Sequence, residues 1–377
     1  MKWMALLAAV VLTLFAGCRK ADGGSIRPEE PYLDSLCLYR MGDFGSQFWR
    51  IPALLCLDDG ILLAVNDKRK YSYKDLPEDI DIVCRRSTDN GATWSEPQTI
   101  VEGAGYKHGY GDPALVQCEN GDVLCFFVGG NGLWASTEAD PIRSYVCRST
   151  DRGLIWNEPE DITAQIWGSQ AANLACYNYK ASFFASGNAL RLREGLHKGR
   201  VLVAAAMVRP NAPRLDNFVV YSDDNGLSWN VSDVAFVEGD EGKLVELDEG
   251  TVLLSVRCNG ARGYNVSFDG GQSWSSQGTW PKMTVNACNG DMLRLDDSTL
   301  IHSLPDSMSR ENVSIFVSDD EGRNWSRRVL LVQGPSAYSS LALLADGKMG
   351  CYVEKGPDTG CELWLYRFNR EWLMGER

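Results

Sequence analysis

The chain has 377 residues, of which 44% are hydrophobic and 12 are tryptophan, so it holds ample apolar material for a core. Its formal net charge of −13 at pH 7 argues against nucleic acid as a partner, because nucleic-acid-binding surfaces are basic. The three histidines are widely separated and no paired-cysteine motif is present, so a metal site is not supported.

The N-terminus reads as an export signal. A basic Met1-Lys2 start precedes the apolar run Met4 to Phe15, which is too short to cross a membrane. The ending Leu-Phe-Ala-Gly-Cys18 resembles the bacterial lipoprotein box. We therefore expect a signal peptide over 1–17, a lipidated Cys18, a tether over 18–31 and a location in the bacterial cell envelope. The alternative is an ordinary secretory signal with an incidental cysteine.

An eight-residue pattern, Ser-x-Asp-x-Gly-x-x-Trp, then recurs five times, and we refer to each copy as an Asp box. The copies are Ser87–Trp94, Ser149–Trp156, Ser222–Trp229, Ser267–Trp274 and Ser318–Trp325. Asp and Gly suit a tight turn, and the tryptophan returns a large apolar ring to a core. A turn repeated at this spacing between short β-rich runs is typical of propeller blades. The alternative all-β folds, a sandwich or stacked hairpins, do not require it.

We therefore predict an all-β fold, a six-bladed β-propeller over residues 32–377 in which one blade lacks its box. The last apolar run, Leu363–Phe368, is expected to close the ring with N-terminal sequence. Eleven cysteines remain after Cys18, and most lie in apolar runs, where a free thiol acts as a small hydrophobe.

Three arginines interrupt apolar surroundings on different predicted blades. Arg50 follows Phe48-Trp49, Arg257 ends an apolar run, and Arg310 precedes one. Because the same end of every blade faces one central mouth, the three guanidinium groups are able to converge there on a single carboxylate, which suits their geometry. Taken alone, Arg50 is equally consistent with a snorkelling arginine or an internal ion pair.

The Arg50-Ile-Pro motif followed by several Asp boxes resembles the sialidases (neuraminidases), over the whole chain after the tether. The resemblance implies a six-bladed propeller that removes terminal sialic acids, with Arg50, Arg257 and Arg310 gripping the sugar carboxylate. It places the general acid on Asp75, with Asp79 as the rival four residues later, and it places a contact to the sugar ring on Arg69.

The resemblance also places the nucleophile on Tyr338, in Ser336-Ala-Tyr-Ser-Ser. A neutral phenol avoids the like-charge repulsion that a second carboxylate would meet beside the acidic anomeric carbon. Its pKa near 10 requires a base, which the family's pattern assigns to Glu241, with Glu246 competing. Glu354 would hold the first arginine, and Asp112 would lie near the ring hydroxyl and amide.

The resulting expectation is a retaining exo-α-sialidase without cofactors, a monomer whose partners are sialylated glycans and, through the lipid anchor alone, a membrane. Two alternatives stay open. One is an exo-hydrolase of a related 2-keto acid sugar, such as deaminated sialic acid or an octulosonic acid. The other is a non-catalytic glycan-binding propeller. Trp49 and Gly242-Lys243 depart from the family's pattern and leave the pocket for the C5 substituent in doubt.

Overall fold

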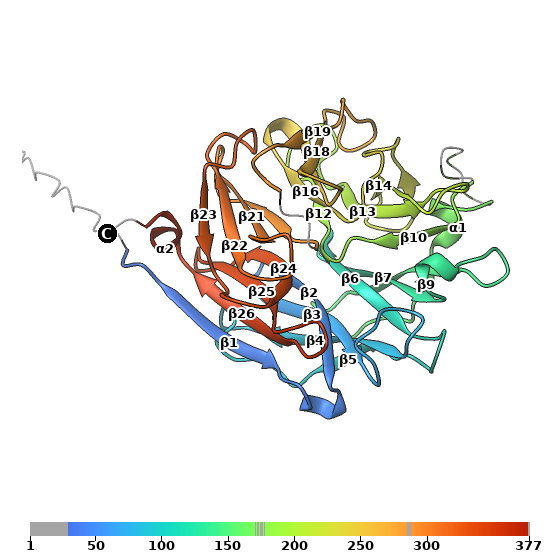
Figure 1. Cartoon of the computed structure of the whole chain (residues 1–377), viewed down its shortest axis with the longest axis horizontal. Coiled ribbons are helices and arrows are strands. Elements are labelled where there is room, and N and C mark those ends of the chain that lie inside the picture. The colour runs from blue at the N-terminus through green and yellow to red at the C-terminus, as the bar shows by residue number, and fades with distance from the viewer. Residues whose placement is uncertain are drawn as a thin grey trace, which may run out of the picture.

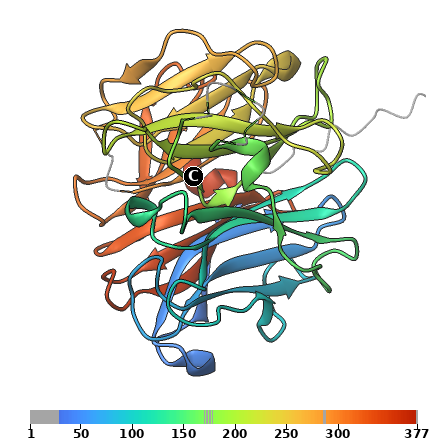
Figure 2. The same ribbon diagram turned by 90° about the vertical axis from the view of Figure 1, so that its right-hand side faces the viewer.

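The strands form a ring of six sheets around a central axis (Figure 1), and all strand pairs but one among the described residues are antiparallel. The computed structural model describes residues 29–169, 171, 173, 176, 178–284 and 288–375. Figure 2 views the ring from the side of blades 2 and 3, with blade 1 in blue below and blade 4 in yellow to orange above. The all-β six-bladed prediction is therefore confirmed.

Each blade is a sheet that begins with its innermost strand. Blade 1 comprises β2 (Phe48–Cys56), β3 (Leu62–Arg69), β4 (Ile80–Ser87) and β5 (Gln98–Val101), and blade 2 comprises β6 (Tyr110–Gln117), β7 (Val123–Gly130), β8 (Ile142–Ser149) and β9 (Glu160–Asp161). Blade 3 comprises β10 (Ala181–Phe184), β12 (Leu190–Arg191), β13 (Val201–Val208), β14 (Leu215–Ser222) and β15 (Asn230–Val231), while β11 (Gly187–Asn188) pairs with β6 instead. Blade 4 comprises β16 (Gly242–Glu246), β17 (Val252–Val256), β18 (Arg262–Ser267) and β19 (Gly278–Trp280), and blade 5 comprises β20 (Asp291–Arg294), β21 (Leu300–Pro305), β22 (Val313–Ser318) and β23 (Arg327–Leu330). Blade 6 comprises β24 (Ser336–Leu343), β25 (Met349–Lys355), β26 (Glu362–Phe368) and β1 (Leu33–Tyr39). The short helices are η1 (Asp43–Gly45), η2 (Leu133–Ala135), α1 (Thr163–Ile166), η3 (Asp248–Gly250) and α2 (Arg370–Met374).

The two ends of the described chain close the ring. β1 lies antiparallel to β26, with Leu33 opposite Phe368, as the sequence predicted. Blade 6 has no Asp box because its outer strand comes from the start of the chain instead of following a turn. The signal peptide over 1–17, Cys18 and most of the tether lie outside the described residues. Among the residues that are described, no helix is both long and apolar enough to cross a bilayer.

Six apolar clusters hold the blades together, one between each neighbouring pair. On β3, Leu63 and Val65 pack toward blade 2, whereas Leu62 and Ala64 pack toward blade 6. This follows from the two-residue period of a strand, which points alternate side chains to opposite faces. Because both faces are covered, middle strands carry continuous apolar runs, such as all of β13, Val201–Val208.

Each Asp box is fastened by its own side chains. In the third box, the Ser222 hydroxyl donates to Asp224 (2.7 Å) and accepts from the Gly226 N–H (2.8 Å). The box also packs against the preceding blade: Trp229 joins the cluster shared with blade 2, and a Cβ on Gly226 would lie 2.5 Å from Leu124. The other four boxes repeat both features. Each Asp box therefore both closes its own turn and packs its blade against the preceding blade.

This arrangement predicts the cost of adding a methyl group at the box glycine. Gly226→Ala puts an L-residue at φ +81° and presses its Cβ onto Leu124. We expect a loss of about 2–5 kcal/mol, from about 1–2 for the left-handed backbone and about 1–3 for overpacking. Gly121→Ala is the matched control, because Gly121 has φ +90° with nothing within 4 Å of the added Cβ. Gly121→Ala should lose only the contribution of the left-handed backbone to the free energy of unfolding. Equal losses for the two variants in urea unfolding would refute the packing role of Gly226.

Candidate active site

The innermost strands of three blades are bulged at the same end of the ring. The ladder register shifts between Arg50 and Ala53 in β2 and between Gly111 and Ala114 in β6. It shifts again in β24, over the stretch that holds Tyr338. A bulge bends its strand and re-aims the side chains there. In the first two strands the bulge carries an X-Pro pair, Ile51-Pro52 and Asp112-Pro113, and proline cannot donate to the ladder.

Arg50 is buried and held by Glu354 of β25. The guanidinium Nε donates to Oε1 (2.7 Å) and Nη2 donates to Oε2 (3.2 Å), and the Ile51 N–H also donates to Oε1 (2.8 Å). This paired geometry fixes the plane of the guanidinium group. Glu354 therefore lies where the resemblance expects the residue that supports the first arginine.

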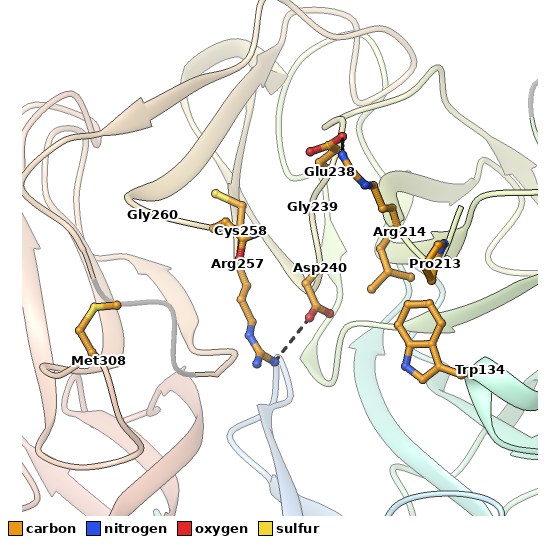
Figure 3. A pocket seen from close by; sticks show the side chains of 12 residues that line it. Trp134, Pro213, Arg214, Glu238, Gly239, Asp240, Arg257, Cys258, Gly260 and Met308 are labelled. Carbon is orange, nitrogen blue, oxygen red and sulfur yellow. Dashed lines mark hydrogen bonds and ion pairs between the residues drawn. The ribbon is translucent and has the colours of Figure 1, made fainter. Parts of the chain in front are cut away.

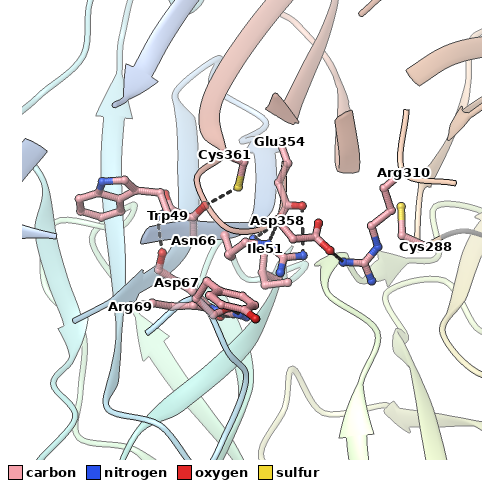
Figure 4. Close-up of polar contacts among 12 residues, drawn as sticks. Trp49, Ile51, Asn66, Asp67, Arg69, Cys288, Arg310, Glu354, Asp358 and Cys361 are labelled. Atoms are coloured by element: carbon pink, nitrogen blue, oxygen red, sulfur yellow. Dashed lines mark hydrogen bonds and ion pairs between the residues drawn. The ribbon is translucent and has the colours of Figure 1, made fainter. Parts of the chain in front are cut away.

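The other two arginines of the expected trio reach the same place. The Arg310 guanidinium lies 5.3 Å from the centre of the Tyr338 ring, and that of Arg50 lies 5.5 Å from it. Arg310 Nη1 donates to Asp358 Oδ2 at 2.8 Å, and Figure 4 shows this ion pair beside Glu354. Arg257 lines the same cavity as Tyr338, so all three guanidinium groups lie in the neighbourhood of one phenol.

Tyr338 and Glu241 line a cavity of about 260 Å³ together with Arg257. Arg257 Nη1 donates to Glu241 Oε2 at 2.9 Å and lies 3.7 Å from Asp240 Oδ2. Burial and the Glu241 charge raise the pKa of Tyr338 well above its usual value. Glu246, the rival base, accepts N–H groups of Arg193 and Glu194 and lines a different cavity.

Asp75 lies at the edge of the cavity with 77% of its side chain exposed. Its Oδ1 pairs with Arg69 Nη2 at 2.7 Å. Partial desolvation raises the pKa of Asp75, but the charges of Arg69 and Arg50 outweigh it and hold the pKa below its usual value. Asp79, the rival acid, pairs with Lys70 at 3.1 Å and does not line the cavity.

Arg69 is almost fully enclosed. Besides Asp75 it donates to Asp67 Oδ2 from Nη2 (2.9 Å) and Nε (3.2 Å), and to the Tyr73 carbonyl. Burial raises the pKa of Asp67 to about 7 despite this partner. Arg69 thus bridges the carboxylates of Asp67 and Asp75, and the contact to the sugar ring that the resemblance implies for it stays a prediction.

Asp112 lines the cavity across from this group and adopts φ +59°. Its N–H donates to Asp67 Oδ1 at 3.3 Å. Burial and the neighbouring charges of Asp67 and Asp75 raise its pKa well above the usual value. A carboxyl group that keeps its proton is able to donate a hydrogen bond to a ligand.

The remaining wall of the cavity is apolar. It is formed by Ile51, Leu76, Val128, Leu133, Trp134, Ile142, Phe183 and Leu215. A second pocket of about 620 Å³ opens beside it and shares Trp134, Leu215, Asp240 and Arg257. Figure 3 shows Arg257 and Asp240 between Trp134 on one side and Met308 on the other.

Sequence reasoning missed four residues of this site. Asp67 lies two positions before Arg69 on one strand, so the strand period was a signal that it shares a face with Arg69. Asp240 precedes Glu241 directly; burial and the Glu241 charge raise its pKa to about 6. Asp358 and Trp134 lie in segments without a distinguishing pattern.

Comparison with known proteins relates the whole chain to sialidases. The model of the BNR repeat-like domain matches residues 69–351. A sialidase of Micromonospora viridifaciens is 33% identical over 98% of this chain, and a sialidase of Bacteroides fragilis is 27% identical over 83%. The solved structure of Hadza microbial sialidase Hz136 is 24% identical, covers 89% of this chain and 68% of its own, and superposes with a TM-score of 0.78.

The chain spans 59% of the length of the Micromonospora protein and 61% of that of the Bacteroides protein. The match of the family model, residues 69–351, nevertheless includes all five Asp boxes. The resemblance seen in the sequence is therefore confirmed: the chain belongs to the BNR-repeat family of Asp-box propellers, the family of these sialidases.

Proposed function

We propose that this protein is a retaining exo-α-sialidase that releases terminal sialic acids from glycans. The observation that carries the proposal is the position of Tyr338, which lies against Arg50 and Arg310 and lines one cavity together with Arg257. Three guanidinium groups suit the carboxylate of the sugar, and a phenol beside them suits its anomeric carbon. Related sialidases support the same activity.

In the first step, the Tyr338 oxygen forms a bond to the anomeric carbon as the bond to the leaving oxygen breaks. Glu241 takes the phenol proton and Asp75 gives its proton to the leaving oxygen. In the second step, water attacks the same carbon and gives a proton to Asp75, while Tyr338 leaves and regains its proton from Glu241. Two displacements restore the starting configuration.

Asp75 must be protonated to act as an acid, although Arg69 and Arg50 favour its ionised form in the free protein. The substrate carboxylate counters this, because its negative charge at Arg50 offsets the guanidinium charge. Binding therefore raises the pKa of Asp75 at the point where the acid is needed. The 77% exposure of its side chain leaves it able to reach the leaving oxygen.

The apolar wall favours an N-acylated sugar over the deaminated alternative. Leu133, Phe183 and Leu215 form an apolar surface for the methyl group of an N-acetyl substituent. A hydroxyl group in the same place would find no hydrogen-bond partner on these three side chains. The raised pKa of Asp112, caused by burial and the charges of Asp67 and Asp75, favours the protonated carboxyl, which is a hydrogen-bond donor in the same cavity.

We also propose that the chain is a monomer in the bacterial cell envelope, attached by lipid at Cys18 through the 18–31 tether. The signal-like N-terminus over 1–17 supports this. The acidic net charge supports the absence of a nucleic-acid partner.

Tyr338→Phe tests the nucleophile. Without the phenol oxygen no sialyl-enzyme forms, and we expect kcat on an aryl sialoside to fall about 10²–10⁴-fold. Tyr145→Phe is the control, because Tyr145 is half-buried in blade 2 away from the cavity. Thermal unfolding should be similar for both variants. Full activity of Tyr338→Phe would end the assignment.

The pH dependence tests Asp75. The ratio kcat/KM reports groups of the free enzyme, and Asp75 must be protonated to act. Because the pKa of Asp75 is lowered in the free protein, kcat/KM should begin to fall at a low pH as pH rises. In the complex the pKa is raised, so the alkaline limb of kcat should lie at higher pH. Asp75→Asn should remove that limb from both profiles. Identical limbs for kcat and kcat/KM in the unmodified protein would contradict the role.

A pair of matched aryl glycosides tests the apolar wall. We expect kcat/KM for the N-acetyl sugar to exceed that for the deaminated sugar about 10-fold or more, as for a buried methyl group. Phe183→Ser should reduce this preference, whereas Phe44→Ser, on the exposed η1 turn, should not. A preference for the deaminated sugar would favour the alternative 2-keto acid substrate.

A further inference from the structure

The face opposite the catalytic mouth carries both the Asp boxes and the entry of the chain. In blade 1 the strand ladder runs from Arg69–Ile80 at the mouth to Leu62–Ser87 at the first box. β1 begins at that same end, since Leu33 pairs with Phe368 and the neighbouring Arg367 donates to the Asn90 carbonyl (3.0 Å) of the first box. We call this end of the ring the Asp-box face.

Large apolar side chains protrude from part of this face. They are Leu154 and Ile155 in the second box, Leu227 in the third, Phe268 in the fourth and Leu196 in a loop beside it, and they are between 51% and 93% exposed. We call these five the apolar tips. The first and fifth boxes carry Ala92-Thr93 and Arg323-Asn324 at the equivalent turns.

The apolar tips are held in fixed turns. The Ile155 and Leu227 N–H groups both donate to the aspartate of their own box, at 2.8 Å and 3.0 Å. Arg200 ties the Leu196 loop to the fourth box through the Gly270 carbonyl (3.0 Å). Single exposed apolar residues are ordinary, but these occupy three consecutive blades of one face.

Their position relative to the chain entry is what makes them informative. The tips belong to blades 2, 3 and 4, and the chain enters at blade 6, which lies across the ring from blade 3. A tether alone would attach the propeller at blade 6 and leave its tilt relative to the membrane variable. Additional contacts at the opposite blades would keep the whole Asp-box face parallel to the membrane.

We propose that the Asp-box face rests on the bilayer that anchors lipidated Cys18, with the apolar tips in contact with lipid and the catalytic mouth pointing away. The proposal rests on the lipid anchor put forward above. A linker as long as residues 18–31 typically spans about 20 Å, which keeps the face near the surface. The contact with lipid is made by the apolar tips. Because the boxes around them are acidic, this face suits a zwitterionic bilayer better than an anionic one.

The orientation has a consequence for substrate choice. The eight-residue strands of a blade separate the two faces by about 25 Å. The mouth therefore addresses glycans that are soluble or displayed on a facing surface, rather than sialic acids carried on short headgroups of the same membrane.

Lipid quenching tests the contact. The lipidated full-length chain is placed on phosphatidylcholine vesicles with brominated acyl chains, as Leu227→Trp and as Tyr106→Trp. Tyr106 is exposed on the loop before β6 at the mouth and is the matched control. We expect the added emission of Leu227→Trp to be quenched at least twofold and that of Tyr106→Trp to be unchanged. Equal quenching, or none at position 227, overturns the proposal.

A triple variant, Ile155→Asp with Leu227→Asp and Phe268→Asp, tests the orientation. It should hydrolyse a soluble aryl sialoside at the normal rate, which also shows that it folds. On vesicles that contain a sialylated glycolipid, it should cleave that lipid several-fold faster than the unmodified chain, because the ring is free to swing. An unchanged rate overturns the proposal.

Two further outcomes are decisive. A mature chain without lipid on Cys18 overturns the proposal. If no aryl sialoside is hydrolysed by any form, the sialidase assignment fails, while the quenching result still decides the orientation.

Discussion

Covering both faces of every blade is the constraint on which this structure depends. The middle strands have no solvent side, so β3 is apolar toward blade 2 and apolar toward blade 6. The clusters between blades leave no place for a charged side chain without a partner. A buried charge also needs a partner, and Arg50 and Arg69 each lie against a carboxylate. The ring therefore gathers paired charges at its mouth.

The fold was predictable because its signals are local and repeated. A box fixes its own turn by hydrogen bonds within eight residues, and the sequence shows five of them. The contact of each box with the preceding blade was not predictable, because it depends on which leucine lies there. Gly226 meets Leu124, about a hundred positions earlier, and no local pattern links the two.

In the site, too, contacts between residues close in the chain were predictable from the sequence and contacts between distant residues were not. Arg50 and Glu354 are 304 positions apart, and only the family's pattern paired them. Asp358 lies in a loop whose composition reads as solvated, although its carboxylate meets Arg310. Enclosure of Arg69 was hidden in a charged segment that resembles an exposed loop. The strand period pointed to Asp67, but the burial that shifts its pKa depends on the surrounding blades.

In the free protein each of the three arginines already has a carboxylate partner, and these partners affect the proposed reaction. Glu354, Asp358 and Glu241 each hold one arginine of the trio. The first two keep their arginines aimed at the place where a sugar carboxylate would lie. The third differs, because Glu241 must accept a proton. A substrate carboxylate that pairs with Arg257 competes with Glu241 for that guanidinium group, so in the proposed reaction substrate binding frees Glu241 to accept the phenol proton.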